Sequence, residues 1–157
     1  MNKAKKIILI TANKTGGVVQ FTEQLAETLS ELNMEYVCYF PKGTQISKSF
    51  IKTKYYSINP FECLLSKDVR LLCKQILDEN GSIVWFTDSA LMSDMALRKI
   101  CKKSKTMLTI HDPKPHPTNK TGILHFLFEV YHSICKSKAL ACSDAITLLS
   151  SQSKEVF

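Results

Sequence analysis

The chain has 157 residues, a length typical of one domain, with 45% hydrophobic and 22% charged residues. These values are ordinary for a globular protein, and we find no apolar run as long as a membrane span and no signal peptide, so we expect a cytoplasmic protein. The net charge of +7 is concentrated in lysine clusters that suit anionic lipid or phosphorylated ligands, but no motif of a nucleic-acid-binding module accompanies them.

The six cysteines form no CxxC pair, and their spacing fits neither a zinc module nor a disulfide framework. Most have apolar neighbours, where cysteine behaves as a small hydrophobic residue. We therefore interpret them as reduced and structural. They are Cys38, Cys63, Cys73, Cys101, Cys135 and Cys142.

Strand-like and helix-like segments alternate from the start of the chain. The continuous apolar run Lys6–Ala12 is typical of a strand buried on both faces. Gly16-Gly17 connects it to a helix over about Val18–Leu32, whose apolar residues recur at spacings of three and four. Two further strands are predicted at Glu35–Phe40 and Lys54–Ile58.

The remaining segments continue the alternation. Asn59-Pro60-Phe61-Glu62 is a typical helix start, with Asn as the cap, and that helix is expected to end near Asn80-Gly81. The later predictions, in order, are a strand at Ser82–Phe86, a helix at Ser89–Cys101, a strand at Thr106–Ile110, a helix at Thr121–Cys135, a strand at Ala139–Cys142 and a helix from Ser143 that still continues at Phe157. Repeated βα units predict an α/β fold, a Rossmann-like parallel sheet flanked by helices, over residues 1–157.

Polar residues follow four of the predicted strands. Ligands of open parallel sheets bind beyond the carboxyl ends of the strands, where the strand order reverses. The residues expected at this edge are Thr11-Ala12-Asn13 at the end of the first strand, Thr87-Asp88-Ser89 after Phe86, His111-Asp112 after Ile110, and Ser143-Asp144 after Cys142.

Two features at this edge are candidates for chemistry. Gly16-Gly17 lets a backbone approach a phosphate at the following helix N-terminus, although two glycines are also common in a tight turn. His111-Asp112 can act as an acid–base or hydrogen-bonding pair stiffened by the following prolines, or His111 can simply be a structural residue at a strand end.

Other features favour less specific interpretations. His111, Asp112 and His116 lie close in sequence, but no fourth ligand is evident, so we predict no metal site. His125 and His132 can share a helix face or simply pack. The surrounding segment Ile123–Tyr131 is apolar nearly all round, which favours a buried helix, with docking to a second domain or a membrane as the alternative.

The glycine pair, the HDPKPHP loop and the closing CSDAITLLSSQSKEVF together resemble the N-terminal, acceptor-side domain of GT-B glycosyltransferases, most closely the retaining family-4 enzymes that use nucleotide sugars. The resemblance implies that Gly16, Gly17 and Ser143 face the donor or its phosphates and that His111 contacts the donor sugar. It also implies that Asn13, Asp88 and Asp112 lie on the acceptor rim.

The resemblance covers only the acceptor half of such an enzyme, because the donor-binding domain with its E-x7-E pair is expected to be absent. Glu23 with Glu31, and Glu27 with Glu35, have this spacing by chance within the first helix and its exit.

The implied function is therefore the acceptor-binding half of a glycosyltransferase. It would transfer sugar from a nucleotide sugar, a co-substrate with no further cofactor, to a glycan or lipid-linked acceptor. The chain would be a truncated product, an expressed domain, or one subunit of a split enzyme whose partner chain supplies the donor domain. The basic surface would suit contact with the inner face of the membrane. The alternatives are a non-catalytic Rossmann-like binding or interaction module and an unrelated nucleotide-binding domain.

Overall fold

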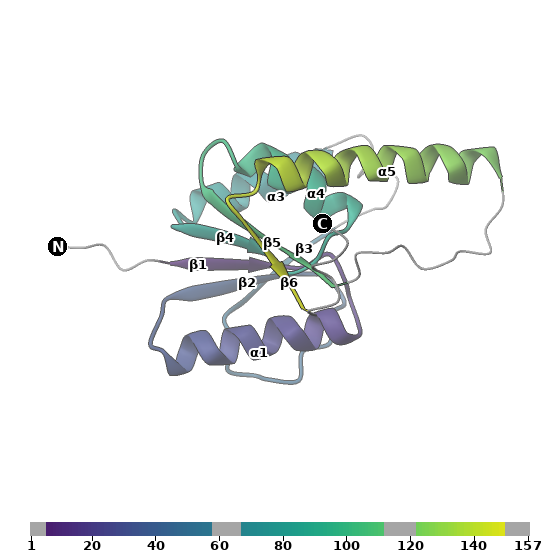
Figure 1. The fold of residues 1–157 in the computed structure, drawn as a ribbon. Helices are drawn as coiled ribbons and strands as arrows, with labels where there is room; N and C mark the ends of the chain where they lie inside the picture. The colour runs from purple at the N-terminus through teal and green to yellow at the C-terminus, as the bar shows by residue number, and fades with distance from the viewer. Residues whose placement is uncertain (1–5, 58–66, 112–121, 150–157) are drawn as a thin grey trace.

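A computed structural model describes residues 6–57, 67–111 and 122–149, and it contains one parallel six-stranded sheet (Figure 1). The strand order is β3-β2-β1-β4-β5-β6. The strands are β1 (Ile7–Ile10), β2 (Tyr36–Pro41), β3 (Thr53–Tyr56), β4 (Ile83–Phe86), β5 (Lys105–Ile110) and β6 (Ala145–Leu148). The predicted fold class, a Rossmann-like parallel sheet flanked by helices, is thus confirmed.

The centre of the sheet is β1, whose four residues are all buried. Its neighbours are β2 on one side and β4 on the other, both in parallel register. The chain builds outward from β1 to β3, returns, and then builds outward from β4 to β6. The strand order therefore reverses between β1 and β4, which is where open α/β sheets bind ligands.

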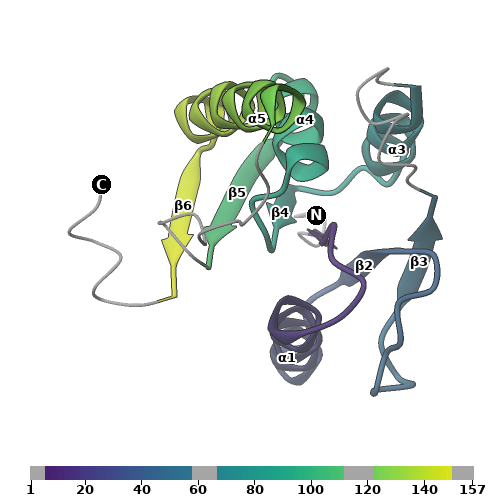
Figure 2. The same cartoon turned by 90° about the vertical axis from the view of Figure 1, so that its right-hand side faces the viewer.

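Helices cover the two faces of the sheet unequally (Figure 2). On one face lies α1 (Gly17–Glu31), packed through Val19, Ala26 and Leu29 against the odd-numbered residues of β1. The other face carries α3 (Lys67–Asp78), α4 (Leu91–Ile100) and α5 (Ile123–Cys142). The chain passes from β1 to β2 through α1, from β4 to β5 through α4 and from β5 to β6 through α5, whereas residues 42–52 join β2 to β3 without a helix.

Most predicted elements are confirmed within one or two residues, but the last part of the chain differs. The predicted strand Ala139–Cys142 is wrong, because those residues form the final turn of α5. The helix predicted from Ser143 is also wrong at its start, because β6 occupies Ala145–Leu148. The physical reason is that Cys135 and Ala139, four residues apart, are both buried on one face of the helix and extend it. The helix start predicted at Asn59 and the end predicted at Phe157 lie outside the described residues.

The cysteines that the structure describes support their interpretation as packing residues. Cys38, Cys73 and Cys135 are buried, and none of the five described thiols forms a disulfide. Burial raises the pKa of Cys38 to about 12 and that of Cys73 to about 11, so both thiols stay protonated and unreactive near neutral pH.

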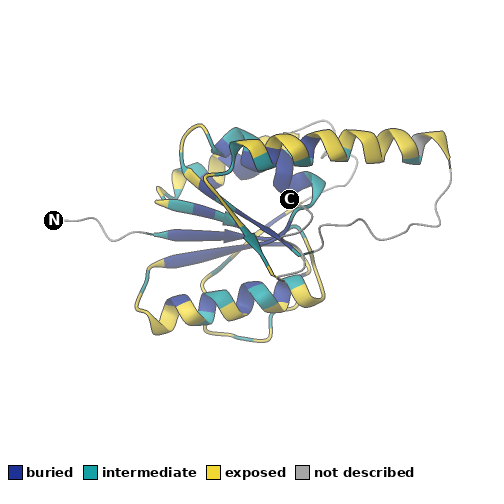
Figure 3. Cartoon of the chain, in the orientation of Figure 1, coloured by how far each residue is buried: buried dark blue, intermediate teal, exposed yellow. Residues whose placement is uncertain are grey.

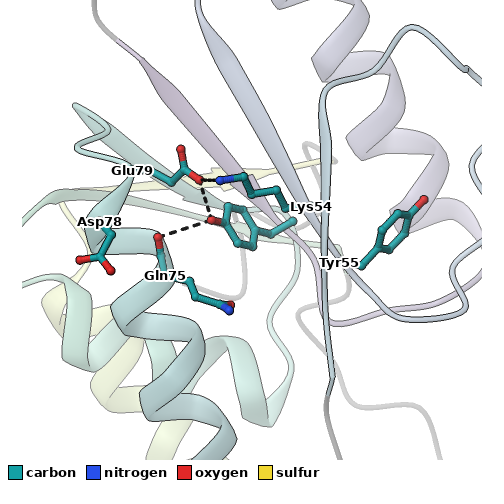
Figure 4. Close-up of a pocket in the computed structure, with 6 residues that line it drawn as sticks. Lys54, Tyr55, Gln75, Asp78 and Glu79 are labelled. Atoms are coloured by element: carbon teal, nitrogen blue, oxygen red, sulfur yellow. Dashed lines mark hydrogen bonds and ion pairs between the residues drawn. The ribbon is translucent and has the colours of Figure 1, made fainter.

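A charged cluster ties the end of α3 to the central strands. The Glu79 carboxylate accepts hydrogen bonds from Lys6 Nζ at 2.6 Å and from the Tyr39 hydroxyl at 2.9 Å. It also accepts one from Lys54 (Figure 4). Burial alone would raise the pKa of Glu79, but these hydrogen bonds outweigh it and lower the pKa to about 2. A depression of about 450 Å³ adjoins the cluster, and because Glu79, Lys54 and Tyr39 already bind one another, we interpret it as structural.

We predict that Glu79→Gln destabilises the fold by about 1–3 kcal/mol at neutral pH, because two lysines and a tyrosine lose a charged acceptor. In the wild-type protein the contribution of Glu79 is complete above its ordinary pKa of 4.5 and is lost as the pH falls from there toward 2. Urea unfolding at several pH values measures both effects, and Glu79→Gln should flatten the acid limb.

Glu27→Gln is the matched control for this measurement. Glu27 pairs with Lys48, but its side chain is 41% exposed, so the variant should lose at most about 1 kcal/mol. Equal losses for the two variants would contradict the structural role assigned to Glu79.

Candidate functional site

Asp88 joins the carboxyl ends of β1 and β4 at the point where the strand order reverses. Its Oδ2 atom accepts hydrogen bonds from Thr11 Oγ1 at 3.0 Å, from the Ala12 amide at 2.6 Å, and from the amide and side chain of Asn13 at 3.2 and 3.0 Å. Its other oxygen binds the Ser93 hydroxyl in α4. Asp88 is buried, and this burial raises its pKa, while the hydrogen bonds oppose that shift. Asp88 therefore positions the loop that leaves β1.

That loop delivers the chain to the N-terminus of α1 through Gly16 and Gly17. Gly16 has φ +87°, a left-handed conformation that favours glycine, and its carbonyl accepts the amides of Val19 and Gln20. No side chain caps the helix, and its first turn holds no acidic residue. A Cβ atom at either glycine would meet no other atom within 4 Å. The start of α1 is thus uncapped and has open space beside both glycines, an arrangement that suits an anion.

His111 lies at the end of β5, with its ring held from two sides. Its Nε2 atom is 2.7 Å from the carbonyl oxygen of Thr87, the residue before Asp88. Because a carbonyl only accepts hydrogen bonds, Nε2 carries the proton, and in the neutral ring Nδ1 is left as an acceptor. The edge of the ring contacts Phe21 of α1, with ring centroids 5.3 Å apart. The ring therefore contacts a side chain that lies one helical turn after Gly17.

The structure thus brings five of the predicted residues to one edge of the sheet: Asn13, Gly16, Gly17, Asp88 and His111. Asp112 and His116 lie outside the described residues. The arrangement offers helix amides for an anion, the Asn13 amide side chain, and an imidazole nitrogen able to accept a hydrogen bond from a hydroxyl group.

Ser143 does not join this edge, so its predicted position after a strand is wrong. It follows α5 and precedes β6, and its hydroxyl donates to the Ala139 carbonyl at 2.8 Å. The adjacent Asp144 binds Lys105 Nζ at 2.6 Å and the Thr106 amide at 2.9 Å, at the start of β5. Both residues therefore lie at the amino edge of the sheet, which follows from the misassigned strand Ala139–Cys142.

A set of buried hydroxyl groups lies behind the site. Thr22 Oγ1 of α1 lies 2.7 Å from Thr87 Oγ1, and Thr87 in turn donates to the Ile10 carbonyl at 3.1 Å. Thr11 and Thr87 were expected at this edge because each follows an apolar strand, whereas Thr22 was missed, since a threonine within an amphipathic helix carries no such signal. These hydroxyls fix α1 to the switch point between β1 and β4.

Within residues 6–57, 67–111 and 122–149, no group of three histidine, cysteine or acidic side chains is arranged to hold a metal ion. His125 Nε2 lies 3.7 Å from Glu129 on the same helix, and His132 Nε2 lies 3.5 Å from the buried Asp94 of α4. The two helix histidines thus have separate acidic neighbours.

Comparison with known proteins identifies the fold but not a family. No protein-family model and no curated protein sequence matches the chain. Among solved structures, Acinetobacter baumannii MurG is similar with a TM-score of 0.65 and 9% identity, over 92% of this chain and 41% of MurG. An α-glucosyltransferase in complex with UDP and a 13-mer DNA containing a central A:G mismatch has a TM-score of 0.57 and 12% identity, over 93% of this chain and 37% of its own.

These similarities show a GT-B glycosyltransferase-like fold. They confirm the expected resemblance at the level of the fold, because identities of 9% and 12% carry no residue-level information. The chain spans about two fifths of the length of each of these two proteins.

We predict that Asp88→Ala destabilises the protein by about 3–5 kcal/mol, since several buried donors lose their acceptor. Asp88→Asn should cost less, about 1–2 kcal/mol, because the amide oxygen can still face Thr11, Ala12 and Asn13 while its NH₂ group donates to Ser93. Urea unfolding measures this order. Asp78→Asn, at an exposed position of α3, is the control and should change stability by less than about 0.5 kcal/mol.

We also predict that neutral His111 is protonated at Nε2. Long-range ¹H–¹⁵N spectra of the ring nitrogens should show an unprotonated Nδ1, with the signals assigned by their loss in His111→Gln. Protonation at Nδ1 would contradict the hydrogen bond to Thr87 and the acceptor role of the free nitrogen.

Proposed function

We propose that this chain is the acceptor-side, Rossmann-like half of a glycosyltransferase that transfers a sugar from a nucleotide sugar to a glycan or lipid-linked acceptor. The retaining, family-4-like chemistry that the sequence resembles is part of this proposal. So is a donor-binding domain supplied by a longer protein or a partner chain, because one Rossmann-like half offers only one wall of a two-domain cleft.

The observation that carries the proposal is the uncapped N-terminus of α1, which opens at the strand-order reversal beside His111. Neither glycine has a neighbour within 4 Å of a potential Cβ atom, so the backbone amides can approach a ligand closely. The absence of acidic residues from the first turn of α1 keeps this approach favourable for a phosphate. The GT-B-like fold agrees with this placement.

Each residue then has a defined role. The amides after Gly16 would bind donor phosphate oxygens and stabilise negative charge on the leaving nucleotide. His111 would accept a hydrogen bond from a sugar hydroxyl at Nδ1, or donate one to a phosphate when its ring is doubly protonated. Asn13 would orient the acceptor. Asp88, whose oxygens are occupied by donors of the protein, would keep the loop in register and contribute through positioning.

A second candidate, a non-catalytic interaction module of the same fold, is favoured by one specific observation. The outer face of α5 carries exposed apolar residues, including Ile123 and Phe126. The two candidates are separable, since one places the ligand at the start of α1 and the other on α5, which lies on the opposite face of the sheet (Figure 2).

We predict that UDP and UDP-sugars bind this chain weakly, with a Kd on the order of 1 mM, about −4 kcal/mol. In ¹⁵N-resolved spectra the shifts should be confined to the loop around Gly16 and to His111. Gly17→Ala should fold normally, because Gly17 has no left-handed strain and open space in front of it, yet weaken binding at least fivefold, since its methyl group would occupy the phosphate position.

Gln24→Ala, at an exposed position of the same helix, is the matched control and should leave binding unchanged. GDP and its sugars form a parallel arm that tests which nucleotide is preferred. Micromolar binding by the chain alone would instead identify a self-sufficient nucleotide-binding domain. Shifts that are absent, or that survive Gly17→Ala undiminished, would contradict the proposed site.

A further inference from the structure

The helix α5 has an apolar face that no described part of the chain covers. Ile123, Phe126, Leu127, Val130 and Ile134 follow one another at spacings of one, three or four, which places them on one side of the helix. Their exposed fractions are 77%, 65%, 56%, 41% and 48%. The interpretation of this segment as a buried helix is therefore wrong for this face.

The body of the protein holds α5 mainly by its second half. Cys135 and Ala139 are buried in the core that α5 shares with α4, whereas the first half extends beyond the sheet with its surface exposed (Figure 3). Those apolar side chains in the first half of α5 that the structure describes are not explained by packing against its core, because they are exposed. A helix face that only meets water would carry polar residues instead. No helix among the described residues is long and apolar enough to cross a membrane.

A basic groove lies farther along the same helix, where it packs on α4. It has a volume of about 440 Å³, and its lining includes Arg98, Lys99 and Lys102 of α4 and Lys138 of α5. Among the ion pairs of the described residues, none includes any of these four cations. The groove therefore concentrates uncompensated positive charge beside the apolar face.

We propose that this surface, the apolar face of α5 with the adjacent basic groove, docks the protein on a bilayer that contains anionic phospholipids. The apolar side chains would enter the boundary between headgroups and acyl chains, and the groove would bind lipid phosphates. This proposal does not depend on sugar transfer. It replaces the general basic surface expected from the sequence with a specific helix and groove.

Charge complementarity selects this occupant over a second copy of the chain. A net charge of +7 opposes self-association, and the uncompensated cations of the groove would find no matching anionic surface on an identical molecule near α5, where Glu129 already faces His125. An anionic bilayer complements both the apolar and the basic part.

Sedimentation with vesicles tests the proposal. The chain should bind vesicles of phosphatidylcholine mixed with phosphatidylglycerol at least about tenfold more strongly than vesicles of phosphatidylcholine alone, and added salt should weaken this binding. The double variants Ile123→Gln/Phe126→Gln and Lys102→Gln/Lys138→Gln should each reduce binding about tenfold. Ile123 and Phe126 lie on the apolar face, whereas Lys102 and Lys138 line the groove, so the two variants test the two parts of the surface separately.

The matched control is Leu71→Gln/Lys52→Gln, which removes an exposed leucine and an exposed lysine far from α5 and should leave binding unchanged. Unfolding temperatures of all variants should match that of the wild-type protein, since every substituted side chain lies on the surface. Equal losses in the control, or equal binding to neutral vesicles, would overturn the proposal. It would equally be overturned by a dimer that Phe126→Gln dissociates, or by a monomer that binds no vesicles.

Discussion

The candidate site depends on a single buried carboxylate. The strand order reverses between β1 and β4, so α1 and α4 lie on opposite faces of the sheet. The loop after β1 bonds to Tyr39 of β2 and Tyr56 of β3 at Thr11, and beyond Thr11 it needs further support. Asp88 supplies that support by accepting hydrogen bonds from Thr11, Ala12 and Asn13 while it also contacts Ser93 at the start of α4. The start of α1 is thereby set, and so is Thr87, the residue whose carbonyl orients the His111 ring.

The fold and the edge that carries the site were predictable because they follow from local patterns. An apolar run such as Ile7–Ile10 can only be a buried strand when glycines and an amphipathic helix follow it. The function of Asp88 was not predictable from such patterns. A polar residue just after a strand looks the same whether it faces a ligand or the protein, and its partner Thr11 lies 77 positions away in the chain. Only the strand order brings the two together.

The errors near the end of the chain have a common physical origin in α5. The run Ala139–Cys142 is too short to show a period, so its strand-like composition could not reveal that it continues the helix. The apolar residues on all sides of α5 similarly indicated burial, but among the side chains of this helix that the structure describes, the buried ones are Cys135 and Ala139. Misplacing this helix also moved Ser143 from the amino edge of the sheet to the opposite one.

The helix α5 is anchored toward one end and exposed at the other. The helix has 20 residues and so is about 30 Å long, but those of its described side chains that are buried, Cys135 and Ala139, lie in its second half. His132, near its midpoint, lies 3.5 Å from Asp94 of α4, one residue after the Ser93 that binds Asp88. A displacement of α5 at Phe126 would therefore be transmitted along the helix to the first turn of α4, which contains Asp94. A ligand bound at the free end of the helix would therefore be connected, through His132, Asp94 and Ser93, to the Asp88 carboxylate that holds the loop at the strand-order reversal.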